Sequence, residues 1–384
     1  MLHSTCPKPK GRRSMWALGL ALLVLAAASR SAVTADAAEP AKIDADDPRI
    51  QYVGRFDFSD PKSPTCSWSG SAVRARYQGR MIGFVLNDTP ANRKDATGAP
   101  FHNFFEVLID GNLERTIIAR PGESRYAVGD RVAEGQHTIE IFKRTEALVG
   151  FTSFGGFQFP PGGKLLDPPA GPKRRIEFIG DSITAGLDLM KVGKGVFCRC
   201  AQNNYLAYGA VTARNLQAEA ICIAYSANGV HCYSNGSKHN TMPTLYSRIL
   251  PHDPDSKWDF TKWKADVVVI HLGTNDMAAY GMGACRDRFE KFVASYIAFI
   301  GRVRENYGDI HIFCAIGPAL WPAELQKKLP RTVVETMNKK GDKKVHYVLF
   351  ENIGDELHPN AANHRKMARV LTEAIRAETG WDDQ

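Results

Sequence analysis

The feature that most constrains the fold is a change of periodicity near residue 174. Beyond it, largely apolar runs alternate with helical patterns, and these runs cover residues 175–179, 220–225, 266–272, 310–316 and 345–350. Apolar runs of this kind are typical of strands buried on both faces of a parallel sheet, with helices packed over each face. Residues 289–303 and Ala361–Thr379 have the pattern of two such helices. We therefore expect a three-layer α/β domain over residues 174–384.

Residues 45–160 have a different pattern, with short alternating runs and no sustained helical period. Val73, Ala75 and Tyr77 alternate with polar residues, and residues 137–142 are rich in Thr and Ile. Asp110-Gly111 is a hairpin-type turn signal between two apolar runs. This pattern predicts an antiparallel β-sandwich. Residues 161–173, which follow, are dense in Pro and Gly and predict a linker.

Polar motifs follow the predicted strands of the α/β domain, at the sheet edge where ligands gather. They read Gly180-Asp181-Ser182, Ser226-Ala227-Asn228-Gly229 and Gly273-Thr274-Asn275-Asp276 after the first three strands, and Asp355-x-x-His358-Pro359 before the last helix. Each motif by itself fits a turn or a helix cap. Their occurrence together, each at a strand end or in the last loop, favours a catalytic site.

The residue types at these positions are those that acyl transfer requires. A serine hydroxyl such as that of Ser182 is a weak nucleophile until a base, here His358, takes its proton. Asp355, three residues before His358, would hold the second ring nitrogen. The Ser182 and Gly229 N–H groups and the Asn275 amide would bind the oxyanion, without a metal or another cofactor.

The order of these motifs resembles the SGNH (GDSL-type) hydrolase superfamily. Four further segments narrow the resemblance to carbohydrate esterase family 2: Trp68-x-Gly70-Ser71, Ile223-Ala224-Tyr225-Ser226, Asn240-Thr241-Met242-Pro243 and Trp258-Asp259-Phe260. The resemblance implies a jelly-roll domain followed by an SGNH catalytic domain. It further implies an exported acetylxylan esterase-like deacetylase, which removes O-acetyl groups from plant-type polysaccharides such as xylan or glucomannan through an acyl-enzyme. Some members of that family lack a carboxylate partner for the histidine, whereas Asp355 is present here.

Several positions that depart from the family pattern lie where substrate contacts are expected. The second motif reads Ser226-Ala227 where Ser-Gly is usual, and His231 replaces an aromatic residue expected to line the sugar site. Tyr233 follows two residues later, and Trp321 lies in a loop after the fourth predicted strand. We expect His231, Tyr233 and Trp321 to contact the substrate. The sequence does not identify the sugar or the hydroxyl that carries the acetyl group.

Two other functions fit parts of the sequence. A lipid or thioester hydrolase of the same superfamily would need an apolar acyl groove. An exported carbohydrate-binding protein without activity would have lost catalytic positions, yet all of them are filled. The sequence has no G-x-S-x-G motif, which argues against the α/β-hydrolase fold, and no H-E-x-x-H metal motif.

Residues 1–37 have the pattern of a secretory signal peptide. Lys8, Lys10, Arg12 and Arg13 precede a 13-residue apolar run, and Ala35-Asp36-Ala37 offers a cleavage site. The run is shorter than the ~20 residues that span a bilayer. We expect cleavage and a secreted or periplasmic protein without a stable membrane anchor.

The leader also accounts for much of the positive charge. It holds five of the 49 Lys and Arg residues and one of the 41 Asp and Glu residues, so its removal lowers the net charge from +8 to +4. The remaining basic residues form no run interleaved with aromatics. We therefore expect no nucleic-acid partner.

Seven cysteines remain once Cys6 is removed with the leader. Cys222 and Cys314 lie in apolar strand-like runs and are expected in the core. Four others lie in loop-like segments and are the better disulfide candidates, their pairing left open: Cys198, Cys200, Cys232 and Cys285. The Cys198-x-Cys200 spacing does not fit a zinc site.

Overall fold

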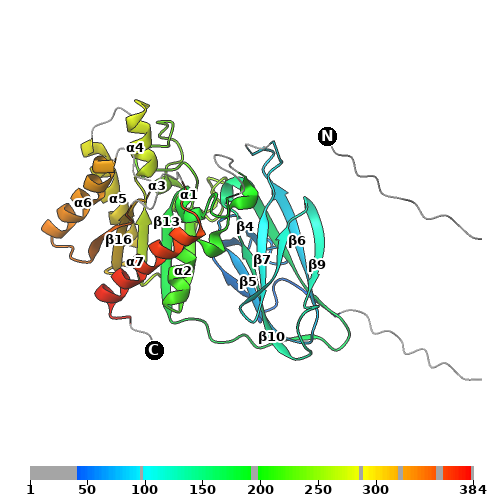
Figure 1. Cartoon of the computed structure of the whole chain (residues 1–384). Coiled ribbons are helices and arrows are strands. Elements are labelled where there is room, and N and C mark those ends of the chain that lie inside the picture. The colour runs from blue at the N-terminus through cyan, green and yellow to red at the C-terminus, as the bar shows by residue number, and fades with distance from the viewer. Residues whose placement is uncertain are drawn as a thin grey trace, which may run out of the picture. The chain divides into compact units, whose positions relative to one another are not determined.

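The computed structural model describes residues 41–95, 98–191, 198–284, 289–318, 323–351 and 358–381. Residues 39–384 form one compact unit, built from an antiparallel β-sandwich and a parallel-sheet α/β domain (Figure 1). This confirms the expected fold class.

The sandwich consists of two sheets of six strands. The first has the order β3-β4-β11-β6-β9, with β1 paired to β11, and its strands span Phe56–Asp57, Thr65–Cys66, Gly150–Phe159, Ile82–Pro90, Gly122–Val128 and, for β1, Ala41–Ile43. The second has the order β12-β5-β10-β7-β8, with β2 paired to β5, and its strands span Lys164–Leu166, Ala72–Gln78, Gln136–Lys143, Phe104–Ile109, Asn112–Ile118 and, for β2, Gln51–Val53.

The sandwich core lies between the two sheets. Tyr77 and Ile141 of one sheet pack in a common cluster with Phe84 and Phe157 of the other, all of them buried. The predicted hairpin turn joins β7 to β8, where Asp110-Gly111 has positive φ at both residues, 51° and 75°. This is the geometry that favours Asp-Gly in a two-residue hairpin loop.

Part of the predicted linker belongs to the sandwich. Strand β12 lies within residues 161–173 and pairs antiparallel with β5. Leu165 of β12 is buried in the sandwich core. Its burial and the pairing with β5 attach this Pro- and Gly-flanked segment to the sandwich.

The α/β domain contains a parallel sheet with the order β14-β13-β15-β16-β17. In chain order these strands span Arg174–Gly180 (β13), Ala218–Ala224 (β14), Val267–His271 (β15), His311–Ile316 (β16) and Val345–Leu349 (β17). They match the five predicted apolar runs to within two residues at each end. Alternate residues face opposite sides: Phe178 packs with the helices of one face and Ile179 with those of the other.

Helices cover both faces of this sheet. The α-helices span Ser182–Ala185 (α1), Tyr208–Asn215 (α2), Met242–Leu245 (α3), Thr274–Gly281 (α4), Phe289–Tyr307 (α5), Ala323–Lys339 (α6) and Ala361–Thr379 (α7). Three 3₁₀ turns span Ala147–Val149, Arg199–Ala201 and Asn204–Leu206. Helices α2 and α7 pack together on one face, and α5 and α6 on the other (Figure 1).

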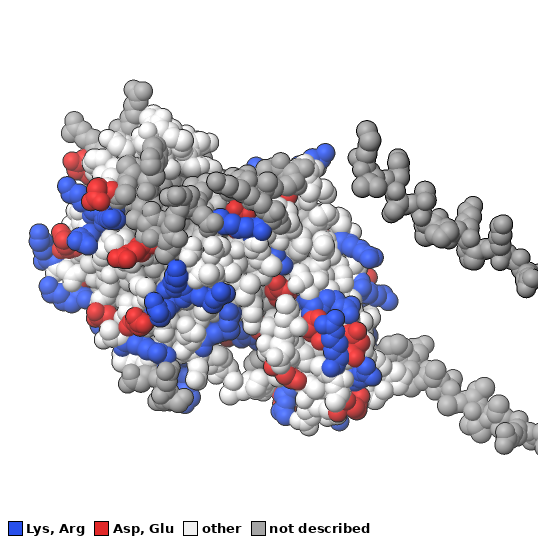
Figure 2. All heavy atoms as spheres, viewed as in Figure 1, with Lys and Arg blue, Asp and Glu red and all other residues white. Residues whose placement is uncertain are grey.

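Charges of both signs are interspersed on the face shown in Figure 2. Within the described ranges, no helix is both long and apolar enough to cross a bilayer.

Among the cysteines, Cys198 and Cys200 form a disulfide with each other. Cys222 and Cys314 are buried in strands of the parallel sheet, as predicted. Cys232 is also buried, and Cys285 lies outside the described residues.

Candidate active site

Ser182 and His358 meet at the carboxyl edge of the parallel sheet. Ser182 is the first residue of α1, directly after β13, and His358 lies shortly before α7. The Ser182 Oγ atom lies 2.9 Å from His358 Nε2, close enough for the hydroxyl to donate a hydrogen bond to the ring. The two side chains are 176 positions apart in the sequence, and the strand–helix topology brings them together.

Asp181 orients the residues around Ser182. Its Oδ1 atom caps α1 by accepting a hydrogen bond from the Ile183 N–H at 3.0 Å. Its Oδ2 atom accepts a second one from Asn275 Nδ2, also at 3.0 Å. Asn275 Nδ2 donates its other hydrogen to the Asn228 carbonyl at 3.0 Å. Both Asn275 amide hydrogens are therefore engaged within the protein.

The loop after β14 provides backbone N–H groups near the serine. Ala227 lines the same pocket as Ser182, with a left-handed φ of 61°. Gly229, the predicted oxyanion donor of this loop, is not among the lining residues. Within the described part of the chain, the N–H groups of Ser182, Ala227 and Gly229 donate to no acceptor.

Asp276 holds the rest of this loop in place. Its buried carboxylate accepts hydrogen bonds from three consecutive backbone N–H groups, those of Val230, His231 and Cys232, at 2.7–3.0 Å. A Cβ atom on Gly229 would come closer than 3.0 Å to the Asp276 carboxylate and to the Cys232 carbonyl oxygen. Glycine at 229 is therefore required by packing.

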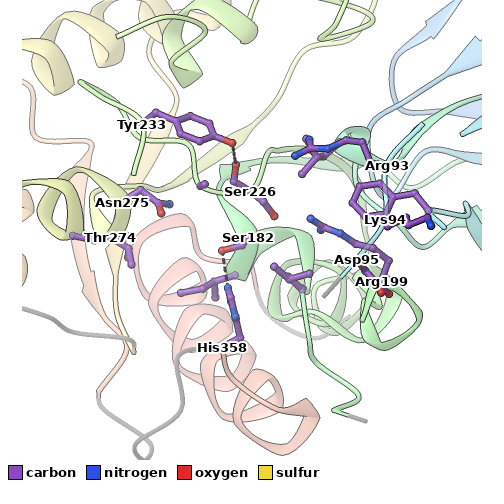
Figure 3. A pocket seen from close by; sticks show the side chains of 16 residues that line it. Arg93, Lys94, Asp95, Ser182, Arg199, Ser226, Tyr233, Thr274, Asn275 and His358 are labelled. Carbon is purple, nitrogen blue, oxygen red and sulfur yellow. Dashed lines mark hydrogen bonds between the residues drawn. The ribbon is translucent and has the colours of Figure 1, made fainter. Parts of the chain in front are cut away.

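A pocket of about 420 Å³ opens at Ser182 and His358 (Figure 3). Both parts of the chain line it. The sandwich contributes Arg93, Lys94, Asp95, Phe101 and Leu148, and the α/β domain contributes Ser182, Ile183, Leu187, Arg199, Ser226, Ala227, Tyr233, Thr274, Asn275, Ala278 and His358. Its volume lies within the ~300–1,000 Å³ range of small-molecule sites.

Glu146 links the sandwich directly to this site. Its side chain is fully buried and accepts hydrogen bonds from the Ser226 N–H at 2.7 Å and from the Ser226 hydroxyl at 2.5 Å. Glu146 also forms an ion pair with Arg199. The sandwich thus holds Ser226, the residue directly before Ala227.

The predicted substrate contacts have different positions. Tyr233 lines the pocket, and its hydroxyl donates to the Ser226 carbonyl at 3.0 Å. His231 is not among the lining residues, and its Nδ1 atom lies 2.9 Å from the Ser295 hydroxyl of α5. Trp321 and Asp355 lie outside the described residues.

Burial changes the protonation of the central groups. Burial, together with the positive charges of Lys191 and Arg199, lowers the pKa of His358 to about 4, so the imidazole is neutral at pH 7. Burial raises the pKa of Asp181 to about 7, and the charge of Asp276 acts in the same direction. A neutral imidazole is the form that can accept a proton from serine.

Several residues of the pocket were not identified from the sequence. Arg93 and Arg199, and Glu146 behind them, lie in segments without a recognisable motif, and their positions depend on contacts between distant parts of the chain. Thr274, in contrast, belongs to an identified motif; it lines the pocket, and its buried hydroxyl has no hydrogen-bond partner within the described ranges. No group of three or more His, Cys, Asp or Glu side chains that could hold a metal ion occurs in those ranges.

Family models match both parts of the chain. Residues 52–169 match "Carbohydrate esterase 2 N-terminal", and residues 178–366 match "GDSL-like Lipase/Acylhydrolase family". A solved structure of a family two carbohydrate esterase from Clostridium thermocellum, in complex with cellohexaose, is 37% identical with a TM-score of 0.79, and the match covers 87% of this chain and 100% of that one. The chain belongs to carbohydrate esterase family 2. This places it among the carboxylic ester hydrolases.

Two curated relatives extend the comparison. The cellulase/esterase CelE of Acetivibrio thermocellus is 39% identical over 347 residues, which cover 88% of this chain and 40% of that protein. This chain thus spans less than half the length of that relative. An acetylxylan esterase / glucomannan deacetylase of Cellvibrio japonicus is 25% identical, with 84% of this chain and 88% of that protein covered.

Proposed function

We propose that this family member is an exported serine esterase that removes O-acetyl groups from plant-type polysaccharides or oligosaccharides. The main support is the hydrogen bond between Ser182 and the buried His358, both of which line a pocket. The relatives named as acetylxylan esterases and glucomannan deacetylases support the substrate class. The signal-peptide pattern of residues 1–37 supports export.

In the proposed reaction, the Ser182 hydroxyl attacks the acetyl carbonyl while His358 Nε2 takes its proton. The resulting imidazolium then protonates the departing sugar oxygen, and an acetyl-serine remains. Water, deprotonated by His358, then attacks the acetyl carbon; the bond from that carbon to Ser182 Oγ breaks, acetate leaves, and the imidazolium returns its proton to Oγ. Asp355 is proposed to orient the ring and to stabilise its charged form.

The developing oxyanion requires donors that are already in place. The Ser182 N–H donates to no other group, and Ala227 supplies a second such N–H from a residue that lines the pocket. Asn275 can complete the set by exchanging its hydrogen bond to Asp181 or to the Asn228 carbonyl for one to the oxyanion. We therefore assign the second backbone donor to Ala227 in place of Gly229.

The first experiment replaces the nucleophile. Ser182→Ala should lower kcat for acetate release from acetylated xylan or an aryl acetate by ~10⁴-fold or more, because the remaining groups cannot form an acyl-enzyme. Circular dichroism checks that the variant is folded. Retained acetate release would contradict the proposed nucleophile.

The second experiment compares acyl groups on the wild-type protein. Acetyl esters should be hydrolysed faster than octanoyl esters of the same alcohol. Faster turnover of the octanoyl ester would indicate a lipid hydrolase, and binding of polysaccharide without any turnover would indicate a binding protein.

A further inference from the structure

One side of the pocket carries an excess of positive charge. Arg93, Lys94 and Arg199 line it together with a single carboxylate among the described lining residues, that of Asp95. In Figure 3, Arg93 and Arg199 lie on the side opposite Asn275 and Tyr233, with Ser182 between the two groups. Because these cations and Ser182 line one pocket, a single ligand can contact both.

The two guanidinium groups differ in what neutralises them. Arg199 is paired with the buried Glu146 carboxylate, so its charge is already compensated within the protein. Arg93 and Lys94 form no ion pair with any residue in the described ranges. Arg93 is exposed at the pocket, and its guanidinium is available to a ligand.

Aromatic packing holds Arg93 in position. The ring of Phe101 is buried and contacts two cations, with its centroid 5.8 Å from the Arg93 guanidinium carbon and 5.0 Å from that of Arg199. Such cation–π contacts reduce the freedom of a long side chain, so less entropy is lost when the guanidinium binds an anion. The fork of N–H donors on Arg matches a planar carboxylate in a bidentate arrangement.

We propose that Arg93, supported by Phe101 and Lys94, forms a subsite for an anionic substituent on the acetylated sugar, the carboxylate of a uronic acid. This inference rests on the proposed esterase function and narrows its substrate to acidic acetylated saccharides.

The test compares methyl glucuronoside and methyl glucoside that carry an acetyl group on the same hydroxyl. For the wild-type protein, kcat/KM for the uronoside should exceed that for the glucoside by about tenfold, mainly through KM, since a charge-assisted contact adds to binding. About 0.5 M NaCl should reduce this advantage. Equal values for the two sugars would overturn the proposal.

Variants assign the effect to Arg93. Arg93→Gln should abolish the advantage of the uronoside, so that kcat/KM becomes equal for the two sugars, whereas Arg93→Lys should retain part of the advantage because the charge remains and the fork does not. The matched control is Arg125→Gln, an exposed arginine of β9 outside the pocket, which should change neither substrate. Equal losses on both sugars in Arg93→Gln would contradict the subsite.

Two further measurements separate the possible failures. A glucoside 6-sulfate with the same acetyl group should show a smaller increase in kcat/KM over the glucoside than the uronoside does. An equal or larger increase would replace the uronate assignment by a sulfate ester.

Calorimetric titration of Ser182→Ala with the two acetylated sugars measures binding and does not depend on turnover. Tighter binding of the uronoside would support the subsite even if no sugar were hydrolysed and the esterase proposal failed, and equal binding would overturn the subsite.

Discussion

His358 is kept neutral by its surroundings. The side chain is 9% exposed, and the cations Lys191 and Arg199 act on it from the same region. Both effects disfavour the imidazolium ion, so its pKa is lowered to about 4. A base that is neutral over a wide pH range can accept the serine proton in mildly acidic conditions, where an ordinary histidine with a pKa of ~6.5 would already be charged.

We expect a pH profile that reflects this lowered pKa. The neutral form is active, so kcat/KM should stay level from about pH 8 down to about pH 5 and decline as the pH approaches 4, where His358 gains a proton. Initial rates with an aryl acetate in buffers of constant ionic strength measure the acid limb. An acid limb centred near pH ~6.5 would contradict the effect of burial.

The loop after β14 shows how one element is shaped by a single buried carboxylate. Asp276, at the start of α4, binds three N–H groups of residues 230–232 and thereby fixes the path of the loop. Gly229 lies against that carboxylate where no side chain fits. Ala227, two residues earlier, has a left-handed conformation that an alanine adopts at a cost of ~1–2 kcal/mol.

Two substitutions in this loop should have opposite effects on stability. Gly229→Ala should lower the free energy of unfolding by about 2 kcal/mol, because the added methyl group displaces backbone or carboxylate atoms. Ala227→Gly, the matched control, should leave stability unchanged or raise it by up to ~1 kcal/mol, since glycine adopts positive φ without strain. Urea unfolding measures both. A Gly229→Ala variant as stable as the wild type would show that the loop can rearrange.

The strands of the parallel sheet could be predicted from the sequence, whereas several strands of the sandwich could not. A strand buried on both faces, such as β15 with its run Val267–His271, is apolar throughout. Strands β8 and β9 lie at the edges of their sheets and are mostly exposed, so their sequences lack the apolar alternation that marks a strand. Strand β12 is too short to produce a pattern.

At the scale of the whole molecule, buried charges join the sandwich to the α/β domain. Arg55, between β2 and β3, is fully buried and donates to Glu177 of β13 at 3.0 Å and to the Arg248 carbonyl at 3.0 Å. Its guanidinium also lies over the rings of Tyr246 and Trp258, at 5.3 and 5.2 Å. The Tyr246 hydroxyl donates to the second Glu177 oxygen at 2.8 Å.

We expect Arg55→Met to lower the free energy of unfolding by about 3–5 kcal/mol, because Glu177 would stay buried without its ion-pair partner. The double variant Arg55→Met/Glu177→Gln should recover part of this loss, since the uncompensated charge is removed. Arg76→Gln, which alters a partly exposed arginine of the sandwich, serves as the control. Urea unfolding measures all three, and a loss below about 1 kcal/mol in Arg55→Met would show that this network does not hold the two parts together.

The amino-acid sequence alone is enough to predict the strand order along the α/β domain and the chemistry of its motifs. Apolar runs reveal buried strands because burial on both faces requires apolar side chains, and the residues after parallel strands meet at one edge for topological reasons. Ser182, Asn275 and His358 could therefore be named in advance, and the structure brings all three to one pocket.

Which atoms face that pocket depends on long-range packing. Ala227 lines it and Gly229 does not, because a carboxylate distant in the sequence directs the loop. Glu146, Arg93 and Phe101 enter the site from the sandwich, and no spacing in the sequence relates them to Ser182. Contacts between two domains depend on how their surfaces pack together, and local periodicity does not encode that packing. The packing of the two domains brings to the site the residues that we propose select its substrate.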